Sequence, residues 1–442
     1  MEFKSYKLSQ LVKRKKVSAK IEPEKLYKRV TVKLYHKGVI QRDEELGVNI
    51  KSSMFYVSSG DFILSGIDAR NGAFGIVPEE LEGAIITNDF WCLEPNAELL
   101  NKEFFLFLTS TSFFDYICKI CSDGTTQRIR LQKDKFFDFE ISIPSVKNQL
   151  ILVEKLKLVN SVGSNISSEI NHQLDLIKDL RQAFLREAMQ GVLVSNETQN
   201  GATGADLLVE IQAEKAQLVK EKKIKKGKLQ EAEMLEGLMF NVPENWIWSK
   251  LDDLTVYITD GTHQTPNYTE KGRIFLSAQN VKPFKFKPEL HRFVSEEDYQ
   301  NYILNRTPEK GDLLVARVGA GIGETAVIDR DIEFAFYVSL GLVKPFKSHL
   351  SSEYLAYVFN SPYGVKYAKG NISSKGGSAG NFNLGRIRSF LIPLPPLEIQ
   401  ERIVAKLDEL MAVCDALETQ VKQSQLTNEQ LLQQVLREAL GA

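Results

Sequence analysis

No stretch of the 442-residue sequence is long and apolar enough to cross a membrane, and its start, "MEFKSYKLSQ", lacks the apolar core of a signal peptide. We therefore expect a cytoplasmic protein. Cysteine is also scarce: the four cysteines do not form a disulfide framework in a chain of this length. Cys118 and Cys121 make one CxxC without a second pair, so we interpret them as small, half-buried residues rather than zinc ligands.

Motifs of the common catalytic sites are missing as well. There is no GxxxxGK[ST] phosphate-binding loop, and the five histidines show no metal-ligand spacing. The segment "VGAGIGET" has the wrong glycine spacing for a dinucleotide loop and is followed by a strand-like "TAVID", which favours a glycine-rich hairpin. The Asn-Pro-Pro-aromatic tetrapeptide that an amino-methylating site needs is also missing. These absences predict a chain without a catalytic site of its own.

Neither sign of charge dominates the composition. The formal net charge is −1, with 43% hydrophobic and 26% charged residues, values typical of a soluble globular protein. The length is enough for two or three domains. Because there is no overall basic field, any contact with nucleic acid must come from local clusters.

The sequence does contain a long internal repeat. "DFEISIPSVKNQLILVEKL", from Asp138, is echoed by "SFLIPLPPLEIQERIVAKL", from Ser389. The two segments begin 251 positions apart, as do Pro144 and Pro395, and "SGDFIL" and "KGDLLV" keep the same offset upstream. This period is far too long for a solenoid, so each repeat is a domain-sized unit.

Each repeat has a mixed front part and a helical back part. The front parts alternate short β-like runs and glycines with helical stretches, which predicts an α+β globule. Long proline-free segments follow, and the prolines just before them suit the first turn of a helix. We expect a first globule at 1–144, a long helix at 145–194, a polar linker and charged helix at 195–243, a second globule at 244–395 and a C-terminal long helix at 396–442.

The two long helices carry a stripe whose spacing alternates between four and three residues, typical of a coiled-coil seam. We therefore predict that they pair with each other, rather than lying as two ordinary amphipathic helices on their own globules. Gln173 and Ser424 hold equivalent places in the stripe and are expected to fix the register. The predicted seam positions are Leu152, Leu156, Val159, Gly163, Ile166, Ile170, Gln173, Ile177, Leu180 and Phe184, and then Ile403, Leu407, Leu410, Cys414, Leu417, Val421, Ser424, Asn428, Leu431 and Val435.

Local clusters favour DNA as the ligand. The first globule contains "KRKKVSAKIEPEKLYKRVTVKLYHKGVIQR", a basic density that suits phosphates, whereas the second offers "DGTHQTPNY" and "LSAQNVKPF", whose polar side chains are of the types that read base edges. Both have a small polar loop before the last strand, "SDGTTQRIR" and "SSKGGSAGNFN". Each loop alone could be ordinary surface, but they recur at matching positions. The predicted contacts are Lys13, Arg14, Lys15, Lys16, Lys33, Tyr35, His36, Lys37, Thr125, Thr126, Gln127, Arg128, Thr262, His263, Gln264, Asn267, Tyr268, Gln279, Asn280, Lys375, Gly377, Ser378 and Asn381.

The order globule, long helix, globule, long helix resembles the specificity subunit of a type I restriction-modification system. "IPLPPLEIQERIVAKLDEL" is similar to that family's signature at the exit of a target-recognition domain, and "DGTHQTPNY" is similar to a motif at the start of one. "IKSSMFYVSSGDFILSGIDARNGAFGIVP" also looks like a recognition domain of this family. The resemblance covers nearly the whole chain.

The resemblance implies an α+β fold of two tandem mixed α/β target-recognition domains, each followed by a long helix, with the helices paired as an antiparallel coiled coil of pseudo-two-fold symmetry. Each domain would read one half of a bipartite, asymmetric site in double-stranded DNA, and the helices would set the unread spacer. The chain would bind no metal or cofactor. Two modification (methyltransferase) subunits would bring S-adenosylmethionine, and restriction or translocase subunits would use ATP and Mg²⁺, in bacterial or archaeal cytoplasm and without a membrane.

Two other functions stay open. The chain could be the specificity subunit of a fused cleavage–methylation enzyme, or a stand-alone DNA-binding regulator. A methyltransferase fused to its own reader is disfavoured because the cofactor and catalytic motifs are missing.

Overall fold

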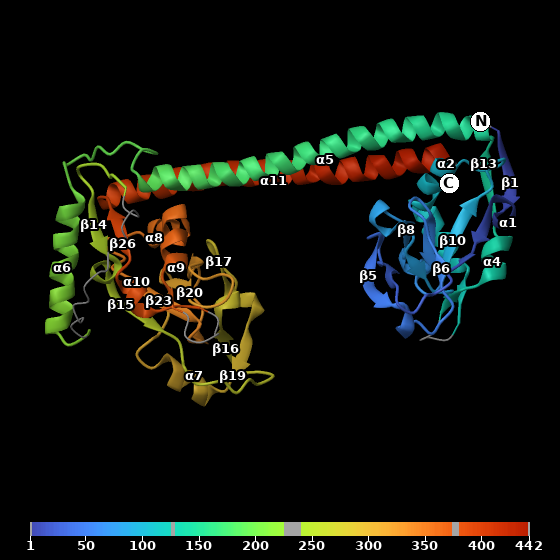
Figure 1. Cartoon of the computed structure of the whole chain (residues 1–442). Coiled ribbons are helices and arrows are strands. Elements are labelled where there is room, and N and C mark those ends of the chain that lie inside the picture. Colours follow the sequence, from blue (N-terminus) through green and yellow to red (C-terminus); the bar gives the residue numbers. More distant parts are fainter. Residues whose placement is uncertain (1, 125–128, 225–239, 374–379, 441–442) are drawn as a thin grey trace. The chain divides into compact units, whose positions relative to one another are not determined.

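The computed structural model describes residues 2–124, 129–224, 240–373 and 380–440 (Figure 1). It divides into two compact units: unit 1 holds Met1–His172 and Val421–Ala442, and unit 2 holds Gln173–Gln420. Among the described helices, none is both long enough and apolar enough to span a bilayer. Some of the predicted DNA contacts lie outside the described residues, namely Thr125, Thr126, Gln127, Arg128, Lys375, Gly377 and Ser378.

Unit 1 is built on an antiparallel sheet of order β2-β10-β7-β8 and a mixed sheet of order β3-β6-β9-β4-β5. The first strand, β1, pairs with the last, β13, and β11 pairs with β12. The strands are β1 (Phe3–Lys7), β2 (Val12–Lys15), β3 (Val17–Ser18), β4 (Leu26–Val32), β5 (Val39–Leu46), β6 (Phe55–Tyr56), β7 (Phe62–Ser65), β8 (Phe74–Ile76), β9 (Ile85–Ile86), β10 (Phe90–Pro95), β11 (Ser122–Asp123), β12 (Arg130–Leu131) and β13 (Glu140–Pro144).

Short helices cover the antiparallel sheet of unit 1. They are α1 (Leu8–Leu11), α2 (Lys102–Thr109), α3 (Ser112–Ile120) and α4 (Lys133–Asp138), with 3₁₀ turns at Gly47–Asn49, Ala69–Asn71 and Glu79–Leu81. Asn101 begins α2 by accepting a hydrogen bond from the N–H of Phe104. The buried rings of Phe62 and Phe136 both meet Phe114 edge to face. Each such buried side chain contributes about 1.5–3 kcal/mol to folding.

Unit 2 repeats this plan with an antiparallel sheet of order β15-β23-β20-β21, and it adds a sheet of order β19-β16-β22. Three two-stranded ladders, β14·β26, β17·β18 and β24·β25, complete it. The strands are β14 (Ile247–Lys250), β15 (Thr255–Asp260), β16 (Arg273–Leu276), β17 (Val281–Lys282), β18 (Lys285–Phe286), β19 (Arg292–Val294), β20 (Leu313–Ala316), β21 (Thr325–Val327), β22 (Phe334–Phe336), β23 (Leu340–Pro345), β24 (Ile372–Ser373), β25 (Asn381–Phe382) and β26 (Leu391–Leu394).

The helices of unit 2 are α6 (Gly204–Lys220), α7 (Glu296–Ile303), α8 (Ser352–Asn360), α9 (Pro362–Gly370) and α10 (Leu384–Arg388), with 3₁₀ turns at Leu251–Leu254, Ala278–Asn280 and Pro288–Leu290. Helix α6 is the described part of the predicted charged helix. It begins with a capping box, in which Thr203 and Asp206 satisfy each other's backbone N–H groups.

The internal repeat is visible in the three-dimensional structure. The pairs β7 and β20, β13 and β26, and α5 (Val146–Met189) and α11 (Leu397–Leu440) each begin 251 positions apart. Gly60 and Gly311 adopt the same left-handed conformation, with φ of 75° and 84°, in equivalent turns where a side chain would be strained. The prediction of two tandem α+β domains, each followed by a long helix, is confirmed.

A buried glutamine joins the long helix to the globule in unit 1. Gln149 has an exposed fraction of 0%. Its Nε2 donates to the carbonyl oxygens of Pro144 and Leu99, each at 2.8 Å, and its Oε1 accepts from the N–H of Asn101 at 2.8 Å. The first turn of α5 is therefore bonded both to the last strand of the globule and to the start of α2.

Gln400 makes the equivalent connection in unit 2 and is likewise fully buried. Its Nε2 donates to the carbonyl of Pro395 at 3.0 Å, and its Oε1 accepts from the N–H of Ser351 at 3.0 Å. The glutamine shared by both repeats is thus part of the junction between strand and helix.

Helices α5 and α11 lie side by side in unit 1 (Figure 1). A Cβ atom on Gly163 would lie 2.7 Å from the side chain of Leu432, so the two backbones approach closely there. One turn later along α5, and one turn earlier along α11, the Nδ2 of Asn428 donates to the Oγ of Ser167 at 3.2 Å and to the carbonyl of Gly163 at 3.3 Å. The pairing is antiparallel.

Ion pairs join the same two helices in unit 2. Arg181 on α5 donates to Asp415 and, at 2.7 Å, to Glu418 on α11. Past the end of α5, Arg402 donates to the carbonyl of Ser195 at 3.0 Å. Residue numbers rise from 181 to 195 on one side of these contacts while they fall from 418 to 402 on the other, so this pairing is antiparallel too.

The structure buries every second position of the predicted seam. The buried positions are spaced by multiples of seven residues, as a heptad requires: Leu156, Gly163, Ile170 and Ile177 on α5, and Leu407, Cys414 and Asn428 on α11. The alternate predicted positions are exposed: Ile166, Gln173, Leu180, Leu417, Ser424 and Leu431. Within unit 1 the seam contains a polar contact between Ser167 and Asn428.

Replacing Gln149 by Ala should destabilise unit 1, and replacing Gln400 by Ala should destabilise unit 2, each by about 2–4 kcal/mol, because buried backbone groups are left without partners. Hydrogen exchange at α2 and α8 measures the two units separately. Gln433, which is exposed on α11, provides the control substitution to Ala and should change neither value. Equal loss of protection in both units after a single buried substitution would contradict the prediction.

Candidate nucleic-acid interface

The loops of unit 2 leave one edge of its antiparallel sheet. Strand β15 ends at Asp260, β20 ends at Ala316 and β23 begins at Leu340; these strands are antiparallel neighbours, so the three positions lie together. Strand β25 reaches the same edge, since the N–H of Phe382 donates to the carbonyl of Arg317 at 2.9 Å. We define the unit 2 loop edge as residues 260–268, 277–280, 317–323, 337–339 and 380–383.

The segment "DGTHQTPNY" is fixed firmly at its base. The carboxylate of Asp260 is paired with the buried guanidinium of Arg317. A Cβ on Gly261 would lie 2.1 Å from the carbonyl oxygen of Phe336, so only glycine fits there. The N–H of Thr262 then donates to that same carbonyl at 3.0 Å. The loop therefore starts from a defined position before its polar side chains emerge.

Several predicted contacts are presented to solvent on this edge: His263, Gln264, Asn267, Tyr268 and Gln279. The Nε2 of His263 lies 3.2 Å from the carboxylate of Asp260. The ring of Tyr268 is covered on one face by the guanidinium of Arg292, 4.5 Å from the ring centroid.

Two of the predicted contacts on this edge, Asn280 and Thr262, are instead buried, with exposed fractions of 0% and 5%. The Oδ1 of Asn280 accepts from the N–H of Ser277 at 2.8 Å, and its Nδ2 donates to the carbonyls of Lys287 and Leu290 at 2.9 and 3.0 Å. These bonds leave the side chain no free donor. Asn280 therefore shapes the loop and cannot read a base.

Asn381 lies at the same edge, half-buried, and forms an isolated β-bridge with Val318. Gly380 separates it from the undescribed segment 374–379. Asn381 and Phe382 thus bring the described end of the "SSKGGSAGNFN" segment to the edge from which the "DGTHQTPNY" loop starts.

The corresponding edge of unit 1 contains the predicted basic cluster. Strand β2 ends at Lys15, and the side chain of Arg14 turns into the protein. Its guanidinium donates to the carbonyls of Asn88 and, at 3.0 Å, Phe90, and it lies 5.1 Å from the ring centroid of Trp91. Burial lowers the pKa of Arg14. The structure does not support the prediction that Arg14 contacts phosphate, because its Nη2 donates to backbone carbonyls of the protein.

The neighbouring lysines differ in their availability. Lys15 pairs with Asp61 at 3.0 Å, and the exposed Lys13 pairs with Glu94 at 3.0 Å. Lys16 is exposed. Its ammonium donates to the amide oxygen of Asn88 at 2.8 Å and lies 5.3 Å from the ring centroid of Phe55, and it pairs with no carboxylate of the described residues. Partial burial and the positive charges of Arg14 and Lys133 lower the pKa of Lys16, as expected where positive potential accumulates.

The other predicted residues of unit 1 occupy the exposed tip, 33–37, of the β4–β5 hairpin. Tyr35 and His36 are both left-handed, with φ of 59° and 56°, a conformation that costs about 1–3 kcal/mol per residue. Their N–H groups donate to the carbonyls of Asn71 and Gly72 at 2.9 and 3.0 Å. The tip is thus held rigidly, with Tyr35 71% exposed between Lys33 and Lys37.

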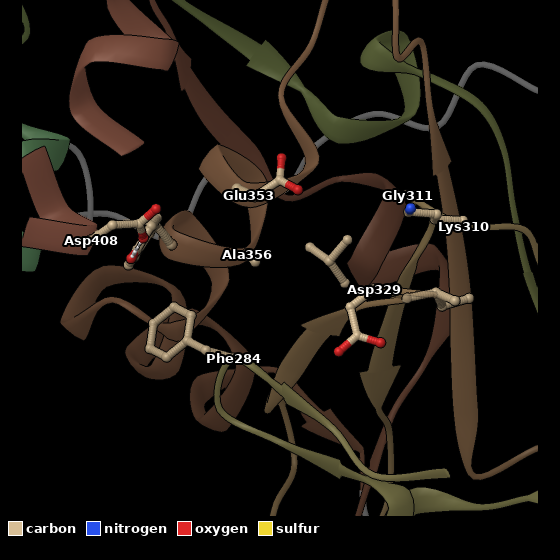
Figure 2. Close-up of a pocket in the computed structure, with 10 residues that line it drawn as sticks. Phe284, Lys310, Gly311, Asp329, Glu353, Ala356 and Asp408 are labelled. Atoms are coloured by element: carbon tan, nitrogen blue, oxygen red, sulfur yellow. Dashed lines mark hydrogen bonds between the residues drawn. The ribbon is translucent and has the colours of Figure 1, made fainter. Parts of the chain in front are cut away.

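A cavity of about 340 Å³ lies at the opposite edge of the unit 2 sheet, where β20 begins and β21 ends. Figure 2 shows Phe284, Glu353 and Asp408 around it. The hydroxyl of Tyr357 donates to Asp408, and burial together with this bond raises the pKa of Tyr357. The lining contains neither histidine nor cysteine. Within the described ranges there is also no group of three or more His, Cys, Asp or Glu side chains suited to a metal ion.

Arg317 is the main residue that was not predicted from the sequence. Its signal was a single arginine within the apolar run "LLVARVG", where an isolated charge must have buried partners. Those partners come from three other parts of the sequence, which is why the run alone did not identify them.

A duplicated α+β fold that presents polar loops from one sheet edge in each copy defines a tandem binding protein. The family model described as "Type I restriction modification DNA specificity domain" matches residues 2–176 and 243–428. The chain belongs to this family.

Named relatives agree with this assignment. The EcoAI specificity subunit of Escherichia coli is 28% identical over 305 residues, which cover 64% of this chain and 47% of that protein. The EcoEI subunit, also from Escherichia coli, is 25% identical over 263 residues, 57% of this chain and 43% of that protein. The chain thus spans about half the length of these two curated relatives.

Solved structures share the fold at low identity. A chain from a study of complex assembly and conformational transition in the type I R-M system matches with a TM-score of 0.66 at 18% identity, covering 99% of this chain and 97% of that one. The HsdS subunit of Thermoanaerobacter tengcongensis matches with a TM-score of 0.52 at 18% identity, covering 99% and 96%.

Replacing Gly261 by Ala should lower the stability of unit 2 by about 2 kcal/mol or more, because the added Cβ meets a carbonyl oxygen and the backbone must move. Thermal melting measures the loss, and hydrogen exchange at 262–268 locates it. Gly370→Ala is the matched control, since nothing lies within 4 Å of its added Cβ. Equal melting temperatures for the two variants would refute the close approach at Gly261.

Proposed function

We propose that this chain is the DNA-reading subunit of a type I restriction-modification complex. Each unit reads one half of a bipartite, asymmetric site in double-stranded DNA through its loop edge. The chain itself performs no catalysis. Two modification subunits bring S-adenosylmethionine, restriction subunits use ATP and Mg²⁺, and all of them assemble on this chain in the cytoplasm.

The observation that supports this proposal most strongly is the convergence of loops in unit 2. Polar segments from distant parts of the sequence, beginning at Asp260, Ser277 and Asn381, meet at one sheet edge. Base reading needs several polar side chains on one rigid surface, and phosphate contacts need cations beside them. Family membership supports the same function, because the matched family is one of DNA specificity domains.

The direct test is to sequence the methylated bases of the host genome with and without this gene. A motif of two short halves separated by unread bases should disappear on deletion. Exchange of residues 1–144 for the matching domain of a relative should change one half of the motif only. If deletion of the gene leaves every methylated motif in place but changes transcription, the chain is a stand-alone regulator instead.

The two kinds of contact should differ in their dependence on salt. Changing Lys16, Lys33 and Lys37 together to Ala should weaken binding to all sequences alike and flatten the slope of log affinity against log salt by about 0.9 for each phosphate that is no longer neutralised. Gln264→Ala should alter preference at one base pair, by about 1–3 kcal/mol if its contact is bidentate. Binding titrations from low to high salt measure both effects.

Lys178, exposed on α5, is the control for the lysine variant and should leave the slope unchanged when replaced by Ala. An unchanged slope in the triple variant would mean that those lysines are solvated surface.

A further inference from the structure

One inward-turned arginine sits at each loop edge, and the two come from different strands. Arg14 belongs to β2, whereas Arg317 directly follows β20. Asn88 and Val338 each lie two residues before the equivalent strands β10 and β23. Arg14 donates to the carbonyl of Asn88, and Arg317 donates to the carbonyl of Val338 at 2.9 Å. The two copies therefore satisfy the same carbonyl position with a guanidinium from a different place.

In unit 2 this arginine connects three loops. Arg317 is 4% exposed. Its Nη1 donates to the carboxylate of Asp260 and to the carbonyl of Val338, and its Nε donates to the carbonyl of Phe382 at 3.1 Å. The bonded segments are 260–268, 337–339 and 380–383, and the first of these carries His263 and Gln264. One side chain thus fixes the bases of loops that are up to 122 positions apart in sequence.

In unit 1, Arg14 holds the loop before β10. Besides the backbone of Asn88, its Nη2 reaches the Oδ1 of that residue at 3.1 Å and the carbonyl of Phe90 at 3.0 Å. The next residue in the loop, Asp89, pairs with Arg130 on β12 at 2.8 Å. The exposed Lys16 donates to the same Asn88 amide. Arg14 therefore holds the loop segment that bonds both to Arg130 and to the predicted contact residue Lys16.

Unit 1 has no room for an arginine at the position that Arg317 occupies in unit 2. Position 66, which lies 251 before Arg317, is glycine in unit 1. A Cβ at Gly66 would lie 2.9 Å from the carbonyl oxygen of Asp89 and 3.1 Å from the Nε1 of Trp91, so no arginine fits there while Arg14 holds this loop. The two copies therefore differ at this position, although the surrounding strands are equivalent.

A lysine cannot reproduce the contacts of Arg317, which donates from two different nitrogens, Nε and Nη1. The guanidinium directs several N–H donors in one plane, whereas an ammonium group is a compact point charge on a flexible stem. Removing a partner from a buried charge leaves the remaining groups unpaired, which is costly. The arginine is therefore required for the loop geometry, not only for its charge.

We propose that Arg14 and Arg317 are positioning residues for DNA reading: each sets the geometry of the contact loops in its own unit without touching DNA. This inference rests on the proposed function. It separates the two half-sites, because in the described part of the chain the hydrogen bonds of each arginine lie within its own unit.

The test compares Arg14→Lys and Arg317→Lys in the full chain, purified with the subunits that accompany it. Binding to a library randomised across both half-sites gives base discrimination at each half, and a salt titration gives the number of phosphate contacts. Arg317→Lys should reduce discrimination at least tenfold at the half-site of unit 2 only, and Arg14→Lys at that of unit 1 only. Both should keep the wild-type salt slope, because the lysines that meet phosphate are unchanged.

Arg388→Lys is the matched control. Arg388 also donates to a carbonyl of β15, that of Ile258, but from α10 and without connecting the loops. It should leave both half-sites unchanged. Asp260→Asn is a second variant of the unit 2 cluster that preserves shape, and it should reproduce a smaller loss at the unit 2 half-site alone.

The outcomes separate this inference from the proposed function. If the wild-type chain prefers no sequence in the library, the proposed function itself fails. If the wild-type selects two half-sites but a lysine variant lowers discrimination at both equally, the arginine only stabilises the fold. If a lysine variant flattens the slope of log affinity against log salt by about one and loses affinity for all sequences alike, the arginine contacts phosphate instead. Unchanged discrimination in both variants would also overturn the inference.

Discussion

One buried glutamine in each unit fixes the start of the long helix against its own globule, and the rest of the unit depends on this junction. Gln149 and Gln400 sit in the first turn of a long helix and bond to backbone groups of the globule. Moving either helix relative to its globule would leave buried carbonyl groups unpaired, at a cost of about 1–3 kcal/mol for each group. Because the last strand of the globule leads directly into that turn, and pairs with the first strand, the sheet and its loop edge are fixed relative to the helix within the unit.

The sequence was sufficient for the architecture because its signals are local or repeated. Prolines before a proline-free helix, and an offset of 251 positions, predicted two copies of one plan, and the structure confirms it. The seam was predicted less well. Predicted positions seven residues apart, such as Gly163, Ile170 and Ile177, are buried, but the alternate predicted positions are exposed. Ser167, which bonds to Asn428, was not among the predicted positions.

The residue types of the "DGTHQTPNY" loop predicted a contact surface from sequence, and several of its polar side chains are exposed at one sheet edge. Individual roles could not be predicted. Burial of Asn280, however, depends on the carbonyl of Leu290, and the inward turn of Arg14 depends on Asn88, 74 positions away. Such contacts leave no local pattern. The copies also differ at the edge while sharing the junction: Gly66 and Arg317 differ, whereas the two glutamines are alike, as the proposed reading of two different half-sites requires.

The seam within unit 1 also sets an order of events during synthesis. Asn428, which bonds to the carbonyl of Gly163, is made 265 positions later. At about 5–20 residues per second the ribosome needs roughly 10 to 50 s to reach it. Throughout that interval the unit 1 part of α5 is complete, but its partner does not yet exist. The α5 residues that later bond to Asn428 are Gly163 and Ser167. Neither has a large apolar side chain, which reduces the tendency of this part of α5 to bind neighbouring nascent chains.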